Sequence, residues 1–198
     1  MARISYVDRE SVPEAYREQF DTHLEISLPD VEAYENVQET NVAGGSRNIY
    51  RLFGHFPVFL ESHREHLSLM WETFDIDPRQ RELALMAGAR EMGSEYEWQH
   101  HVPVALDEGV TVEELRAISA GEFDAFDPEE ALLLEYASRF VRRDIDDELH
   151  GRMAERYDDA ALMALSTLLG FYVFLGYTLD ALDVDLEDPF VGWDLPGF

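Results

Sequence analysis

The pattern of apolar and polar positions is helical in almost every segment of the chain, and no β-hairpin signal stands out. Residues that cap or open helices precede many of the apolar segments. They stand at Pro78, Ser94, Thr111 with Glu114, Asp127 with Pro128, Asp146 and Asp158. Breaks fall near Pro57, at Gly93 and at Gly109. The pattern therefore predicts an all-α protein, a single helical domain of about seven or eight helices.

These signals divide the chain into three parts. Residues 1–45 form an N-terminal arm, which has a short helix around Pro13 to His23 and ends at the pair Gly44-Gly45. Residues 46–183 form the helical domain. Residues 184–198 form an acidic tail rich in Pro and Gly, for which we expect irregular packing.

One segment of the domain, from Ala160 to Leu182, is apolar and long enough to span a membrane. However, Asp180 lies inside it, acidic residues flank both ends, and no cluster of positive charge marks a cytoplasmic side. We therefore predict a helix buried in the core or in a subunit interface rather than a membrane span. A small domain has limited room to cover such a helix on all sides, so the segment also favours a homo-oligomer.

Charge changes this picture strongly. The chain carries 42 acidic residues against 15 basic ones, all of them arginine, and its formal net charge is −27. Such a surface repels itself at low salt, and salt at molar concentration screens the repulsion. The composition thus indicates adaptation to a salty cytoplasm. The absence of a basic patch disfavours binding to nucleic acid.

Cysteine is absent among the 198 residues. The protein therefore has no disulfide, no thiolate metal ligand and no thiol nucleophile. The first ten residues are polar and of mixed charge, and they lack the apolar core of a signal peptide. We accordingly expect a cytoplasmic protein.

Three residues form the strongest candidate for chemistry. Glu97 and His101 are four residues apart and share one face of a helix. Glu82 lies on the preceding helical segment, beyond the break at Gly93. Two carboxylates and an imidazole that face one another can transfer protons without a cofactor.

The same region resembles a known family. The run Glu95-Tyr96-Glu97-Trp98-x-x-His101-x-x-x-Ala105-x-x-x-Gly109, with Arg81-Glu82-Leu83 upstream, is similar to the carboxymuconolactone decarboxylase family, which includes the alkyl hydroperoxidase D proteins. The resemblance implies an α-helical fold that assembles into homo-oligomers. In the peroxidase branch the motif is Cys-x-x-Cys-x-x-x-His, preceded by a glutamate. Its cysteines fall on Ser94 and Glu97, its histidine on His101 and its glutamate on Glu82. Peroxidase activity by thiol chemistry is therefore not expected.

The neighbours of this set have simpler interpretations. Ser94 caps a helix, and Glu97 three residues later completes a capping box. Tyr96 and Trp98 pack in the core, or they form the apolar wall of a substrate pocket to which Ser94 also belongs. His100 points about 100° away from His101 and is structural or exposed.

The sequence therefore predicts a cofactor-independent lyase or isomerase that acts on a small carboxylate or lactone, a substrate class implied by the resemblance alone. His101 would be the general acid or base, Glu82 would orient it, and Glu97 would be a second acid. Two alternatives remain open. One is a metal-dependent enzyme that uses Glu82, Glu97 and His101 as ligands, although we expect no metal or other cofactor. The other is an oligomeric scaffold without catalysis.

Overall fold

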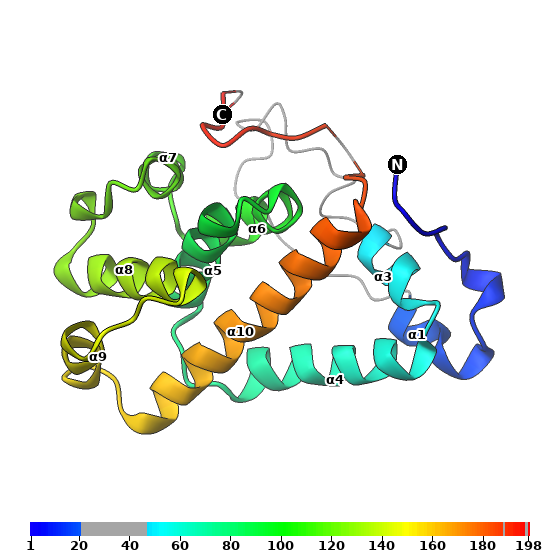
Figure 1. The fold of residues 1–198 in the computed structure, drawn as a ribbon, viewed down its shortest axis with the longest axis horizontal. Helices are drawn as coiled ribbons and strands as arrows, with labels where there is room; N and C mark the ends of the chain where they lie inside the picture. The colour runs from blue at the N-terminus through cyan, green and yellow to red at the C-terminus, as the bar shows by residue number, and fades with distance from the viewer. Residues whose placement is uncertain (21–46, 188, 197) are drawn as a thin grey trace.

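The computed structural model describes residues 1–20, 47–187, 189–196 and 198, and no β-strand occurs among them. The regular elements are helical (Figure 1). They are α1 (Arg17–Phe20), α3 (Asn48–Phe53), α4 (Pro57–Thr73), α5 (Pro78–Met92), α6 (Glu95–Asp107), α7 (Val112–Ala120), α8 (Pro128–Arg142), α9 (Asp147–Ala154) and α10 (Asp159–Leu182). Short 3-10 turns lie at Arg9–Ser11, Glu14–Tyr16 and Phe123–Ala125. The predicted all-α fold is thus confirmed.

Most helices begin where the sequence places a cap. The side chains of Asp127, Asp146 and Asp158 accept hydrogen bonds from backbone N–H groups in the first turns of α8, α9 and α10. Thr111 and Glu114 form the predicted capping box at the start of α7. The break between α5 and α6 is Gly93, whose φ of 68° lies in the left-handed region that favours glycine.

The cap of α6 differs from the prediction. Ser94 Oγ accepts a hydrogen bond from the Glu97 backbone N–H at 3.3 Å, as expected. The reciprocal bond of a capping box is not formed in the described structure, because the Glu97 side chain is buried on the inner face of the helix. The Glu97 carboxyl group is therefore not used in capping α6 and can take part in a functional site.

Helix α5 lies at the centre of the molecule and positions the candidate residues. Its residues from Arg81 through Ala89 are all buried. It contacts α6, α8 and α10, which surround it in Figure 1. One core cluster is formed by residues of α5, α6, α7, α8, α9 and the first half of α10. A second is formed by residues of α3, α4 and α10 together with Leu85 of α5 and Tyr96 of α6. The candidate residues thus lie where the two clusters meet.

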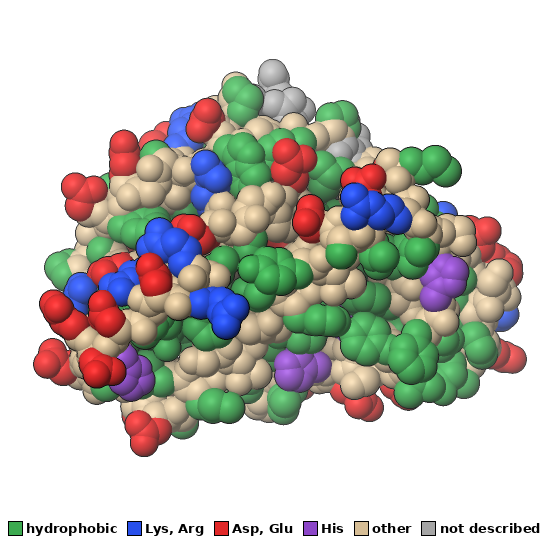
Figure 2. Space-filling view, in the orientation of Figure 1, with side chains coloured by type: hydrophobic (Ala, Val, Ile, Leu, Met, Phe, Trp, Pro, Cys, Tyr) green, Lys and Arg blue, Asp and Glu red, His purple; other side chains and the backbone are tan. Residues whose placement is uncertain are grey.

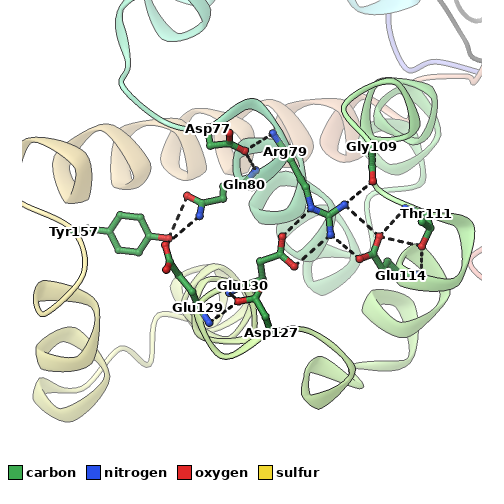
Figure 3. Close-up of polar contacts among 10 residues, drawn as sticks. All are labelled: Asp77, Arg79, Gln80, Gly109, Thr111, Glu114, Asp127, Glu129, Glu130 and Tyr157. Carbon is green, nitrogen blue, oxygen red and sulfur yellow. Dashed lines mark hydrogen bonds and ion pairs between the residues drawn. The ribbon is translucent and has the colours of Figure 1, made fainter.

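A single arginine ties three elements together near the start of α5 (Figure 3). Arg79 Nε lies 2.8 Å from Glu130 on α8, and its Nη2 lies 2.6 Å from Glu114 on α7. Its Nη1 also donates to the Gly109 carbonyl at 2.6 Å. The pKa of Arg79 is raised by its hydrogen bonds to the two carboxylates. This network fixes the orientation of α5 relative to α7 and α8.

The long apolar helix α10 is buried on one face only. It is long and apolar enough to cross a membrane by length and composition alone, and 44% of its most apolar window is buried inside the protein. Met163, Phe174 and Tyr177 remain exposed on its other side. On the face shown in Figure 2, apolar side chains gather along α4 and α10, and charged side chains gather over α8 and α9.

The two ends of the chain agree in part with the prediction. The arm carries the turn Glu14–Tyr16 and the helix Arg17–Phe20, while the rest of the expected helix to His23 and the pair Gly44-Gly45 lie outside the described residues. The described part of the tail after Val184 has no helix and packs irregularly, as expected. Its apolar residues Phe190, Trp193 and Leu195 cover the core cluster of α5–α9.

Candidate active site

Glu82 and His101 meet in the interior between α5 and α6. His101 Nδ1 lies 2.8 Å from Glu82 Oε2. The carboxylate of Glu82 has no exposed surface, and the His101 side chain is 11% exposed. A carboxylate that holds one nitrogen of an imidazole fixes the orientation of the ring and leaves the other nitrogen for chemistry.

The second oxygen of Glu82 is held by its neighbour in sequence. Arg81 Nε donates to Glu82 Oε1 at 2.9 Å, and Arg81 Nη2 lies 3.2 Å from Glu108. The Arg81 guanidinium also stacks over the Trp71 ring at 4.6 Å from its centroid. A buried charge requires such pairing, and both oxygens of Glu82 are accordingly satisfied. Glu82 is therefore a partner of fixed orientation for His101.

Glu97 lies on the other side of the His101 ring. Its Oε2 is 4.0 Å from His101 Nε2, and the residue is 5% exposed. Its Oε1 is buried and has no hydrogen-bond partner among the described residues. Burial raises the pKa of Glu97 to about 7, although the charges of His101 and Arg47 act to lower it. Near neutral pH this carboxyl group can therefore give or take a proton.

The positions of the two carboxylates bear on the metal alternative. Glu82 binds Nδ1 of His101, whereas Glu97 faces Nε2 at the opposite edge of the same ring. One metal ion cannot be bound by both carboxylates and the imidazole in this arrangement, because the ring lies between them. Among the described residues, no group of three histidine, aspartate or glutamate side chains has the geometry of a metal site. The described residues therefore do not fit the three-ligand metal centre that the sequence left open as an alternative.

A cavity of about 310 Å³ opens against Glu97 and His101. Helix α10 contributes Tyr172, whose ring contacts the edge of His101 with a centroid distance of 5.0 Å. Burial, together with the charges of Glu97 and Glu82, raises the pKa of Tyr172 well above its usual value, so the phenol stays protonated. Further lining residues come from α3, α4 and α6, and they include Tyr50, Leu67, Trp71, Tyr96 and Val104. The cavity is therefore aromatic and apolar around a few ionisable groups.

His100 has a structural role beside this cavity. Its Nδ1 lies 2.8 Å from the Tyr96 carbonyl, and its Nε2 lies 2.9 Å from Glu187 of the tail. The Tyr96 hydroxyl donates to the same Glu187 at 2.8 Å and accepts from the Ile49 backbone N–H. Burial acts to raise the pKa of Glu187. Hydrogen bonds from the side chains of His100 and Tyr96 and from the Asn48 backbone N–H nevertheless lower this pKa to about 2. This network holds the tail against α6, in agreement with the structural interpretation of His100.

The structure separates the predicted substrate-binding residues. Tyr96 lines the cavity, as expected. Trp98 does not belong to its wall, because its ring faces the core on another side of α6, where Nε1 donates to the Gly192 carbonyl. Ser94 lines a different cavity with Gly176 and Tyr177. The predictions for Trp98 and Ser94 are thus corrected. The rotation of about 100° per residue turns Trp98 away from Glu97, and Ser94 precedes the helix as its cap, on the side of the other cavity.

Several residues of the cavity escaped the sequence analysis, and four of them carry groups that matter for its chemistry. They are Arg47, His63, Arg64 and Tyr172. Each comes from an element far from the motif in sequence, and a single sequence carries no signal that brings these elements together. The basic type of Arg47 and Arg64 is the one feature that sets them apart in so acidic a chain.

Part of the chain is similar to a known protein family. Residues 63–139 match the model of the Carboxymuconolactone decarboxylase family, and this region contains Glu82, Glu97 and His101. No curated protein sequence matches the chain.

Two solved structures share the fold. The crystal structure of an alkylhydroperoxidase AhpD core, an uncharacterised peroxidase-related protein from Ralstonia eutropha, superposes with a TM-score of 0.71 at 12% identity, covering 98% of this chain and 97% of that one. The debrominase Bmp8, as a cysteine-to-alanine variant in complex with 2,3,4-tribromopyrrole, gives a TM-score of 0.64 at 18% identity and covers 84% and 92%. At these identities the likeness concerns the fold. Residues 63–139 are therefore similar to the carboxymuconolactone decarboxylase family, and the fold of the chain is that of the alkyl hydroperoxidase D-like proteins.

Proposed function

We propose that the protein is a cofactor-independent acid–base enzyme, a lyase or isomerase, whose substrate is a small carboxylate or lactone. The observation that carries the proposal is the buried pair of Glu82 and His101, 2.8 Å apart, next to Glu97 at a cavity. Glu97 Oε1 has no hydrogen-bond partner among the described residues. Two carboxyl groups in such different environments are suited to different roles in proton transfer. The substrate class follows from the family resemblance.

His101 would act as the base. When Nδ1 carries the ring proton and donates it to Glu82, the lone pair on Nε2 is available on the side of the cavity. Nε2 would take a proton from a carbon next to the substrate carbonyl, and the electrons of that C–H bond would move onto the carbonyl oxygen as an enolate. Glu82 would stabilise the imidazolium that results.

Glu97 would complete the reaction as the acid. Its protonated form would donate to the far carbon of the conjugated enolate, which moves the double bond and leaves Glu97 ionised. Transfer of the proton from His101 to Glu97, whose side chains lie 4.0 Å apart, would return both groups to their starting state. In a decarboxylation the C–C bond to the departing CO₂ would supply the electrons of the enolate. Glu97 would protonate the carbon that lost CO₂ and would then take a proton back from water.

The cavity is compatible with a small, flat substrate. Its volume of about 310 Å³ and its aromatic walls suit a ring or a conjugated chain. The debrominase of similar fold is described with a flat, five-membered ring compound, 2,3,4-tribromopyrrole. The thiol chemistry of the peroxidase branch is not part of the proposal, because the chain has no cysteine.

Proton exchange tests this proposal directly. Unsaturated lactones that carry a carboxylate would be incubated with the protein in D₂O at molar KCl, and NMR would follow deuterium incorporation, double-bond migration and CO₂ loss. We expect exchange with the parent protein and its loss in His101→Ala and Glu82→Gln. The controls His150→Ala and Glu148→Gln change exposed residues of α9 and should match the parent. Exchange that survives both site substitutions would assign the chemistry elsewhere.

A further inference from the structure

The cavity gathers basic residues in a strongly negative protein. The chain has a net charge of −27 and 15 basic residues, yet Arg47 and Arg64 both line this one cavity. Arg64 lies on α4, and Arg47 directly precedes α3. Glu97, which shares the cavity, is largely protonated below neutral pH because burial raises its pKa to about 7. When Glu97 is protonated, the two arginines outnumber Glu72, the remaining carboxylate of the lining, so the local charge favours an anion.

The Arg64 guanidinium is held in a defined orientation. It stacks over the Tyr50 ring at 3.7 Å from the centroid, and its Nη1 donates to the Tyr50 hydroxyl at 3.1 Å. Burial lowers the pKa of Arg64, and the charge of Arg47 lowers it further. A guanidinium presents five N–H donors in a planar fork that matches a carboxylate. An arginine fixed by stacking in this way loses little conformational freedom when it binds an anion.

The residue before Arg64 supplies a second, independent sign of a ligand. His63 is 2% exposed and lines the same cavity. Aromatic rings surround it, with Phe53 at 4.9 Å and Phe171 stacked at 5.3 Å between centroids. Its Nδ1 is buried and has no hydrogen-bond partner among the described residues. Burial lowers the pKa of His63 to about 3, so the ring is neutral. A buried polar atom without a partner is costly, and a ligand in the cavity would satisfy it.

We infer that Arg64 and His63 form the recognition wall of the cavity and bind a carboxylate of the substrate. The guanidinium of Arg64 would contact the carboxylate oxygens as a charged fork, and the neutral ring of His63 would donate one hydrogen bond. This wall comes from α4, whereas Glu97 and His101 come from α6. A substrate held by its carboxylate on α4 thus presents its conjugated carbons to the groups that move protons. The inference rests on the proposed function for the identity of those groups.

Calorimetry with a matched pair of probes tests the recognition wall without any turnover. Sorbate is a small conjugated carboxylate, and methyl sorbate has the same carbon chain without the charge. We expect the parent protein in molar KCl to bind sorbate more tightly than the ester. Arg64→Gln should weaken sorbate binding by about tenfold to a hundredfold, leave the ester unaffected and remove the preference. Arg64→Lys should lie between the two, because it keeps the charge without the fork.

Further variants separate recognition from folding and from catalysis. His63→Phe fills the aromatic cluster without a nitrogen and should weaken sorbate binding several-fold. Arg152→Gln, on the exposed side of α9, should bind both probes as the parent does. His101→Ala should keep the preference for sorbate, so that loss of turnover and loss of recognition remain distinguishable.

Two results would overturn the inference. One is equal binding of sorbate and its ester by the parent, or no binding of sorbate at all. The other is an Arg64→Gln protein, folded by circular dichroism, that retains the preference. If Arg64→Gln does not fold, Arg64→Lys takes its place. An Arg64→Lys protein that binds sorbate as tightly as the parent would also overturn the inference. If the parent keeps the preference but exchanges no proton in any lactone, the proposed function fails and the recognition wall stands.

Discussion

The imidazole of His101 is bound at Nδ1 by Glu82, a carboxylate with no exposed surface that lies 19 residues earlier in the chain. Arg81 holds the other oxygen of the same carboxylate at 2.9 Å. The chain of contacts therefore runs from a guanidinium through a carboxylate to an imidazole whose second nitrogen faces Glu97. Such an arrangement orients a base before any substrate arrives, which is the main contribution of the carboxylate in a His–carboxylate pair.

Loss of this orientation should reduce turnover more than binding. Glu82→Gln keeps the shape of the side chain but removes its charge, so the imidazolium formed during proton transfer loses its stabilisation. We expect the rate of proton exchange to fall by about 10²- to 10⁴-fold, with a small change in KM. Steady-state exchange rates of Glu82→Gln and of the exposed control Glu148→Gln would measure this. A proportional rise in KM with unchanged kcat would show that Glu82 acts on binding instead.

Glu97 should make stability depend on pH in a defined direction. Burial raises its pKa from an ordinary value of 4.5 to about 7, so the folded state holds this proton more tightly than the unfolded state. The resulting stabilisation is fully present below pH 4.5 and is lost as the pH rises through about 7. Glu97→Gln stays neutral throughout. Its free energy of unfolding, relative to the parent, should therefore increase between pH 5 and 8 by up to about 3 kcal/mol.

Denaturant titrations of both proteins at several pH values, in molar KCl, would test this. Glu148→Gln, at an exposed position, provides the control and should follow the parent at every pH. If the difference between Glu97→Gln and the parent does not change with pH, the burial of Glu97 does not perturb its titration. The same titration predicts that proton donation by Glu97 declines above about pH 7, since only the protonated form is an acid.

Local rules predict the helices better than they predict the site. Caps such as Thr111 with Glu114 and Asp127 with Pro128 act within one turn, so the sequence alone defines them. The same rule misled at Ser94, where Glu97 fits a capping box but its side chain is buried at the cavity. The Glu97 side chain does not accept the hydrogen bond from the Ser94 backbone N–H that a capping box requires. It lies instead in a cavity whose walls come from other helices.

The recognition wall shows why the rest could not be predicted. Arg64 and His63 lie on α4 within an otherwise ordinary amphipathic segment, and their place beside His101 depends on how α4 packs against α6 and α10. Tyr172 reaches the site from an apolar helix that the sequence presents as core or interface. Residues that are brought together by the packing of distant helices have no characteristic separation along a single sequence. The spacing of Glu97 and His101 was readable because both lie on one helix.

The Arg79 network should contribute measurably to stability (Figure 3). Its side chain is 26% exposed, and its carboxylate partners Glu114 and Glu130 are 28% and 14% exposed. Arg79→Met leaves both acids unpaired at the junction of three helices, and we expect a loss of about 1–3 kcal/mol in the free energy of unfolding. Arg152→Met removes a more exposed pair with Glu135 and should cost less than about 1 kcal/mol. Equal effects of the two substitutions in urea titrations would contradict a special role for Arg79.

The outer face of α10 should form a contact between copies of the chain. Met163, Phe174 and Tyr177 are 68%, 43% and 57% exposed, and their spacing places them on one side of the helix. An apolar stripe of this kind is costly in water, so we propose that a homo-oligomer covers it. Light scattering in molar KCl should give a mass above that of one chain. Phe174→Glu should lower that mass, while His150→Glu on α9 should not. A monomeric parent protein would refute the assembly.

Salt should stabilise the whole molecule. The net charge of −27 repels itself in the folded state, and the screening length falls from about 10 Å at 0.1 M to about 3 Å at 1 M salt. We therefore expect the Tm to rise steadily with KCl up to molar concentration. Chloride is preferred to sulfate for this measurement, because sulfate also strengthens the burial of apolar surface. Neutral substitutions of the exposed acids Glu122, Asp124 and Glu155 should raise the Tm at low salt and flatten its dependence on KCl. A Tm that is the same at low and molar KCl would show that the acidic surface is not an adaptation to salt.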